Sequence, residues 1–239
     1  MTYLKLTRAK AILASFAIVS LLFANFPSVD IQVSKWFFES GFYSQKEWWE
    51  QMLHHGVKYF VGISVAVILG LYAFNKFAKR SVGDVDGKKV VYALTVLILG
   101  AGLLVNAGFK DHFGRARPRD VQEFGGAKLF TPAYVVSNQC TTNCSFVSGD
   151  TAAAFFSLTL VMAFRRRRRA LLLASLAFGI GVSIARLAAG AHFLSDVTVA
   201  FFVMLITSDV LYHYMLSPER EALRMKKAVP AIAVAPAAD

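Results

Sequence analysis

Six stretches of apolar residues limit what this chain of 239 residues can fold into. The hydrocarbon core of a bilayer is ~30 Å thick, and an α-helix needs about 20 mostly apolar residues to cross it. Stretches that approach this length occur at residues 11–27, 56–77, 90–109, 150–164, 170–188 and 194–216. The fourth stretch is the shortest, and we expect residues 145–147 to extend it. The pattern predicts an all-α fold, an integral membrane bundle of six transmembrane helices.

The composition agrees with a membrane protein and excludes several other classes. Hydrophobic residues make up 56% of the chain and charged residues only 17%, which is unusual for a soluble enzyme and far too apolar for a disordered chain. Two cysteines do not make a disulfide-based scaffold, and alone they do not supply a zinc site. We expect a single membrane domain over residues 1–227 and a disordered tail over residues 228–239.

Basic residues gather in the segments that share one side of the membrane if the six spans alternate in direction. These residues are Lys5, Arg8, Lys10, Lys79, Arg80, Lys88, Lys89, the run Arg165–Arg169, Arg220, Arg224, Lys226 and Lys227. Cytoplasmic connections carry an excess of lysine and arginine, so we expect both termini to be cytoplasmic. Segments 28–55, 110–149 and 189–193 then lie on the outer side.

Two other interpretations of these features are less favoured. Residues 1–27 have the basic start and apolar stretch of a signal peptide, but no small-residue cleavage pattern follows, so an uncleaved span is the better interpretation. The net charge of +11 and the run of arginines at 165–169 suggest nucleic acid binding. A basic run between two apolar helices is more typical of a stop at the cytoplasmic headgroups. We therefore expect the bilayer and its lipids as partners, and no nucleic acid.

A second set of charged and polar residues lies at span ends on the outer side, against the overall charge trend. The set comprises Lys110, Arg117, Ser148, Gly149, Asp150, Arg186, His192 and Asp196. Ionisable groups at such depth are costly and usually functional.

Five of these residues are suited to bind phosphate. Lys110, Arg117 and Arg186 supply fixed positive charge and hydrogen-bond donors for phosphate oxygens. Ser148 and Gly149 lie at the expected start of a helix, where a hydroxyl and unpaired backbone N–H groups favour an anion. The outer ends of the spans therefore predict a phosphate site.

His192 and Asp196 provide the residue types for nucleophilic attack on that phosphate. They are four residues apart, so they share one helical face, where a carboxylate can hold the imidazole in one tautomer. A neutral imidazole held in this way can attack phosphorus and form a phosphohistidine intermediate. This chemistry needs no metal ion, and we expect no cofactor.

At these residues the chain resembles the type 2 phosphatidic acid phosphatase superfamily. The segment from Lys110 to Arg117-Pro118 matches the first motif of that family, K-x6-RP, and Arg186-x5-His192-x3-Asp196 matches the third, SR-x5-H-x3-D. Ser148-Gly149-Asp150 resembles the second motif, PSGH. The resemblance implies that His192 is the nucleophile, that Asp196 orients it, and that the phosphate is bound by Lys110, Arg117, Ser148, Gly149 and Arg186.

The chain departs from the family pattern at three positions. Val147 replaces the proline of the second motif and Ala185 the serine of the third, and neither change removes a reacting group. Asp150 replaces the histidine that protonates the leaving oxygen in the family. An aspartate acts as an acid only if its pKa is raised, whereas nearby cations lower it. Either Asp150 acts as the acid in an unusual environment, or the substrate leaves with little protonation, and His112 is a lesser candidate to compensate for Asp150.

A weak acid favours substrates whose leaving group departs easily, such as the anomeric phosphate of a sugar or a diphosphate. Residues 114–120 and 140–149 also resemble the bacterial lipid A 1-phosphatase branch of the family. We expect removal of the 1-phosphate from lipid A or its precursors at the periplasmic face of a bacterial inner membrane. The alternatives are an undecaprenyl diphosphate phosphatase, a lipid phosphotransferase, or a non-catalytic lipid-binding or transport protein. The last would need neither His192 nor Asp196.

The remaining polar residues of interest have plainer interpretations. His54, His55 and His213 lie near span ends, where packing at the membrane interface explains them. Arg115 and Arg119 either contact headgroup phosphates or are solvated. Cys140 and Cys144 lie in an outer loop, where a disulfide is slightly favoured over two free thiols.

Overall fold

The computed structural model describes residues 2–44, 47–110, 112–164 and 168–217. These residues form helices and loops, with no β-strand in the described ranges. The helices are α1 (Thr2–Asn25), α2 (Ser28–Lys35), α3 (Trp48–Phe77), α4 (Gly87–Val96), the π-helical segment η1 (Leu97–Lys110), the short 3-10 turns η2 (Pro118–Asp120) and η3 (Gln122–Phe124), α5 (Gly149–Ala163), α6 (Arg168–Ala188) and α7 (Leu194–Met215). The predicted tail at 228–239 lies outside the described residues.

The predicted spans agree with the helices, except at the start of the fourth. Five helical segments are long and apolar enough to cross a membrane, namely those at Arg8–Asn25, Trp48–Phe77, Gly87–Lys110, Arg169–Ala188 and Leu194–Met215. The sixth, α5, is a shorter apolar helix. Our expectation that residues 145–147 extend it is wrong, because Ser148 caps the helix: its hydroxyl accepts a hydrogen bond from the backbone N–H of Thr151 at 3.3 Å.

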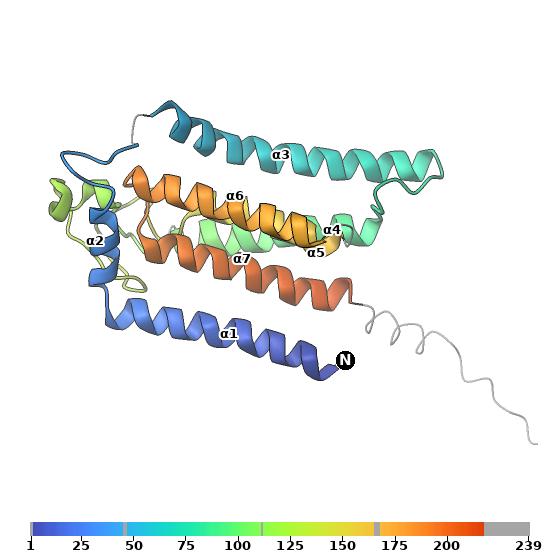
Figure 1. Cartoon of the computed structure of the whole chain (residues 1–239), viewed down its shortest axis with the longest axis horizontal. Coiled ribbons are helices and arrows are strands. Elements are labelled where there is room, and N and C mark those ends of the chain that lie inside the picture. Colours follow the sequence, from blue (N-terminus) through green and yellow to red (C-terminus); the bar gives the residue numbers. More distant parts are fainter. Residues whose placement is uncertain (1, 45–46, 111, 165–167, 218–239) are drawn as a thin grey trace, which may run out of the picture.

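The long helices alternate in direction, as the charge pattern predicted. The start of α1, the turn between α3 and α4, and the end of α7 lie at one end of the bundle, whereas α2 and the long loop before α5 lie at the other (Figure 1). The first end carries Lys79, Arg80, Lys88 and Lys89. The second end is the one that the charge pattern predicts to be outer, and it is called the outer end below. It carries the exposed Trp36 and Trp48, as expected of aromatic side chains at the headgroup level.

The core of the bundle surrounds α5. This helix contacts α3, α4, η1, α6 and α7, and most of its side chains are buried. Phe155 on α5 packs edge-on against Phe201 on α7, with 4.8 Å between the ring centroids. Tyr92 on α4 is fully buried and donates a hydrogen bond to the backbone oxygen of Ser208 on α7 at 3.0 Å. Because neighbouring helices cover α5 on several sides, its short length does not leave backbone groups facing lipid.

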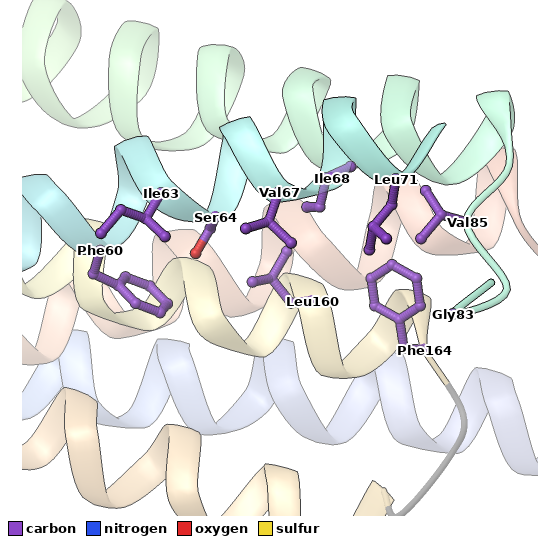
Figure 2. A pocket seen from close by; sticks show the side chains of 10 residues that line it. All are labelled: Phe60, Ile63, Ser64, Val67, Ile68, Leu71, Gly83, Val85, Leu160 and Phe164. Carbon is purple, nitrogen blue, oxygen red and sulfur yellow. The ribbon is translucent and has the colours of Figure 1, made fainter. Parts of the chain in front are cut away.

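An apolar groove lies between α3 and α5, toward the end that carries the α3–α4 turn. Its volume is about 480 Å³, and Figure 2 shows side chains of the two helices facing each other across it. Its lining comprises Phe60, Ile63, Ser64, Val67, Ile68, Leu71, Gly83, Val85, Leu160 and Phe164. The lining contains no charged side chain, so this groove is distinct from the polar residues at the outer end.

Close packing between α5 and α6 makes one glycine specifically important for stability. A Cβ atom added at Gly179 would lie 2.2 Å from the ring of Phe155, so the ring or one of the two helices would have to move. Overpacking a core costs about 1–3 kcal/mol. We predict that Gly179→Ala lowers the melting temperature of the purified protein in detergent. Gly181→Ala is the matched control, because a Cβ at Gly181 meets no atom within 4 Å. Equal melting temperatures for the two variants would contradict this packing.

Candidate active site

A polar cavity of about 480 Å³ opens at the outer end of the bundle. It is lined by Glu50, Gln51, His54, Lys58, Asn106, Lys110, Arg117, Arg119, Asn143, Gly149, Asp150, Ala153, Arg186, Ala189 and His192. Six of the eight predicted site residues are among them. The other two, Ser148 and Asp196, are fully buried beside it. The sequence motifs therefore meet in one place, although they come from different helices and loops.

His192 lies in the short connection before α7, with only 2% of its surface exposed. Its Nδ1 lies 2.8 Å from the backbone oxygen of Ser145 and 3.6 Å from Oδ2 of Asp196. The nearer acceptor is the carbonyl, so Nδ1 carries the proton and Nε2 keeps its lone pair. Burial lowers the pKa of His192 to about 4, despite the opposing effect of Asp196. The ring is therefore neutral near pH 7.

Asp196 is connected to His192 through Ser145 as well as through the 3.6 Å approach of the two side chains. Its Oδ2 accepts hydrogen bonds from the Ser145 hydroxyl at 2.5 Å and from the backbone N–H of Phe193 at 2.7 Å. The hydroxyl and the carbonyl of Ser145 thus connect the carboxylate to the imidazole. Sequence spacing predicted the pairing of Asp196 with His192, but it did not reveal Ser145 as the residue between them.

Arg115 supports this arrangement by binding the other carboxylate oxygen of Asp196. Its guanidinium donates to Oδ1 of Asp196 at 2.6 Å, to the Ser195 hydroxyl at 2.8 Å and to Oδ2 of Asp30 at 2.8 Å. Its Nε donates to the backbone oxygen of Thr131 at 2.7 Å, and only 1% of Arg115 is exposed. Our interpretation of Arg115 as a headgroup-binding or solvated residue is therefore wrong, because its charge is paired inside the protein.

Arg186, at the end of α6, is surrounded by carboxylates that the sequence analysis did not connect with it. One of its terminal nitrogens is paired with Glu50 of α3, which is 2% exposed. Its Nε lies 3.1 Å from Oδ2 of Asp150. A buried guanidinium needs such partners to offset the loss of hydration. Arg186 therefore joins α3 and α5 at the edge of the cavity.

His54 is a cavity residue, and our interpretation of it as interfacial packing is wrong. Its Nδ1 lies 2.8 Å from Oδ2 of Asp150, and 27% of its side chain is exposed. Glu50, His54 and Lys58 are spaced four residues apart along α3, so one face of this helix points into the cavity. That spacing was the available signal for a functional helix face. His55 and His213 are exposed, in keeping with their interpretation as interfacial residues.

The phosphate-binding candidates surround the start of α5. A Cβ atom at Gly149 would lie 3.1 Å from Oδ1 of Asn106 and 3.7 Å from Nζ of Lys110, so only glycine leaves this space open. Arg117 donates to the backbone oxygen of Asn143 at 2.8 Å. Burial, followed by the neighbouring cations Arg119 and Arg186, lowers the pKa of Arg117. Positive charge is thus crowded around a helix N-terminus, which is a favourable environment for an anion.

Two further expectations concern the outer loop. Cys140 and Cys144 form a disulfide, as favoured, and Asn143, which binds Arg117, lies within the loop that they close. His112 is exposed, and its Nδ1 lies 2.9 Å from the backbone oxygen of Ala107. It is not among the residues that line the cavity.

Comparisons with known proteins agree with this geometry. The profile of the PAP2 superfamily matches residues 89–219. A lipid A 4'-phosphatase from Francisella tularensis subsp. novicida is 34% identical over 205 residues, which covers 82% of this chain and 90% of the relative. A second lipid A 4'-phosphatase, from Rhizobium leguminosarum, is 39% identical over 125 residues, covering 52% of this chain and 54% of the relative.

A solved structure supports the fold. The crystal structure of a PAP2-type phosphatidylglycerolphosphate phosphatase from Bacillus subtilis aligns with a TM-score of 0.52 at 18% identity. The alignment covers 85% of this chain and 94% of that protein. Together with the sequence matches and the outer cavity, this establishes that the chain belongs to the PAP2 superfamily and is a membrane-bound lipid phosphatase.

Proposed function

We propose that this protein removes a phosphate group from lipid A, with the 4'-phosphate as the favoured position and His192 as the nucleophile. The observation that carries the proposal is the setting of His192: a buried ring whose Nδ1 is bound to a carbonyl, at the wall of a cavity rich in cations. The names of the relatives support lipid A as the substrate. We place the cavity at the periplasmic face of a bacterial inner membrane, since the basic connections lie at the opposite end.

In the first step, Nε2 of His192 attacks phosphorus while the bond to the leaving oxygen breaks, forming a phosphohistidine. Arg117, Lys110 and Arg186 bind the non-reacting oxygens and stabilise the charge that develops on them. The backbone N–H of Gly149 adds a donor at the start of α5. In the second step, water attacks the phosphohistidine and releases inorganic phosphate. Asp196 and Ser145 keep His192 in the reactive tautomer through both steps.

Two observations bear on which phosphate of lipid A is hydrolysed, and they favour different positions. The relatives support the 4'-position, where the leaving group is a secondary alcohol that needs a proton. The replacement of the usual histidine by Asp150 favours the 1-position, where the leaving group is a more acidic hemiacetal. We take the 4'-phosphate as the first candidate because the similarity extends over most of the chain, and the 1-phosphate as the second.

The nucleophile assignment predicts the effect of removing His192. We expect His192→Ala to reduce phosphate release by at least about 1,000-fold, because no other group takes over covalent catalysis. The assay is release of inorganic phosphate from lipid A in mixed micelles. Melting in detergent should stay close to that of the unchanged protein. More than a few per cent residual activity in the folded variant would refute the phosphohistidine mechanism.

The position of attack can be read from the product. We expect purified protein incubated with bis-phosphorylated lipid A to yield a monophosphorylated product that retains the 1-phosphate, as identified by fragmentation in mass spectrometry. The relatives motivate this expectation. A product that retains only the 4'-phosphate would instead support the second candidate. Phosphate release from undecaprenyl diphosphate but not from lipid A would contradict both.

The cation-rich cavity predicts that catalysis does not require added metal. In the described residues, no three His, Cys, Asp or Glu side chains are grouped as metal ligands would be. Arginine and lysine can instead neutralise the phosphate and its transition state. We expect turnover to be unchanged within about two-fold by EDTA in metal-free buffer. Loss of activity on chelation, with recovery on adding magnesium, would overturn this expectation.

A further inference from the structure

The proposed reaction at the 4'-position expels an alkoxide, which needs a proton as it leaves. Two carboxylates line the cavity, Glu50 and Asp150. Each is ion-paired with Arg186, so its oxygens accept from the guanidinium and are not placed to donate a proton to a substrate. Lysine and arginine are, by their reference pKa values, weak general acids near neutral pH. Another residue of the cavity lining is therefore the better candidate for the proton donor.

His54 has the chemistry and the location for this task. Apart from His192, it is the only imidazole among the cavity-lining residues. Imidazole has an unperturbed pKa near 6.5, which makes it the side chain best suited to proton transfer near neutral pH. Its Nδ1 is bound to Asp150 at 2.8 Å, and its Nε2 has no hydrogen-bond partner among the described residues. That nitrogen is available to a substrate in the cavity.

Asp150 brings His54 and the phosphate-binding residues together. It lies in the first turn of α5, next to Gly149, and its carboxylate contacts both His54 and Arg186. Asp150 is also within electrostatic range of His192. A carboxylate bonded to one ring nitrogen stabilises an imidazolium and orients its other N–H, as in other His–Asp pairs. The cavity thus contains a second histidine held by an aspartate.

We infer that His54 is a catalytic residue that donates a proton to the leaving oxygen, and that Asp150 is the positioning residue that holds it. The inference rests on the proposed phosphatase reaction. It explains how an enzyme with an aspartate at position 150 can act on an unactivated alcohol phosphate. It also removes the need for an anomeric leaving group, which was one of the two grounds for the 1-phosphate expectation.

His54 donates one proton in the first step and regains one in the second, so the protons balance. As Nε2 of His192 bonds to phosphorus, the bond from phosphorus to the leaving oxygen breaks, and the imidazolium of His54 transfers its Nε2 proton to that oxygen. The alcohol leaves and His54 is neutral. His54 then accepts a proton from the water that attacks the phosphohistidine. The nitrogen–phosphorus bond breaks, phosphate departs, and His54 is an imidazolium again.

The test compares two substrates whose leaving groups differ in how much they need a proton from His54. Lipid A has a poor leaving group, whereas p-nitrophenyl phosphate releases a phenolate that departs without a proton. His54→Gln keeps a donor for Asp150 but cannot transfer a proton, and His54→Ala removes both functions. His55→Ala is the matched control, because His55 is the next residue on α3, is exposed and does not line the cavity. The measured quantity is kcat/KM, which reports the steps up to the first irreversible one.

We expect His54→Gln and His54→Ala to lower kcat/KM on lipid A by about 100- to 10,000-fold and on p-nitrophenyl phosphate by only a few-fold. The aryl substrate should then show a burst of one equivalent of nitrophenol, because the phosphohistidine forms normally and is hydrolysed slowly. Added imidazole should partly restore His54→Ala. Asp150→Asn should show the same substrate selectivity, and its effect should not add to that of His54→Gln. His55→Ala should match the unchanged protein on both substrates.

Equal losses on the two substrates, or full activity of His54→Gln on lipid A, would overturn the inference. Melting in detergent identifies a variant that fails to fold, and the imidazole rescue of His54→Ala then decides the question. Failure of the proposed function gives a different result. The unchanged protein would release no phosphate from lipid A but would hydrolyse p-nitrophenyl phosphate and another lipid monoester, such as phosphatidic acid. The same comparison of variants is then made with that monoester.

Discussion

The outer end of this protein depends on the ion pairs of one buried residue, Arg115. Its guanidinium joins Asp30 of α2 to Asp196 of α7, and it also binds the loop at Thr131. Removing one member of a buried ion pair costs about 3–5 kcal/mol, because the remaining charge has lost both water and its partner. Arg115 therefore fixes the position of Asp196, which fixes Ser145, whose carbonyl in turn sets the tautomer of His192.

The side chains that line the cavity carry more positive than negative charge. Its lining includes Lys58, Lys110, Arg117, Arg119 and Arg186, against the carboxylates of Glu50 and Asp150. Both carboxylates lie against Arg186, so they offset its charge and leave the other cations of the lining in excess. In the proposed reaction, a dianionic phosphate ester would supply negative charge to this cavity. The same two carboxylates connect α3 and α5 through Arg186, so ion pairs that line the cavity also join helices.

Some features could be predicted because they depend on residues close together in the chain. Runs of apolar residues specify spans, and the spacing of Arg186, His192 and Asp196 places them at one corner between two helices. The extension of the fourth span could not be judged in this way. Residues 145–147 are compatible with a helix in composition, but Ser148 caps α5, and Ser145 contacts Asp196 and His192 instead. These contacts come from α7 and the connection before it, so the helix boundary could not be judged from residues 145–147 alone.

The sequence by itself determined the membrane fold, the alternation of its spans, and which residues gather around the polar cavity. These follow from local hydrophobicity, charge bias and short motifs. The tertiary structure alone decided the partners of Arg115 and Arg186 and the place of His54 in the cavity. His54 and Asp150 are 96 residues apart, and Asp30 and Ser195 are 165 apart. Such pairs form only when particular helices pack side by side. The spacing of Glu50, His54 and Lys58 marks one face of α3, but it does not say which residues of another helix that face contacts.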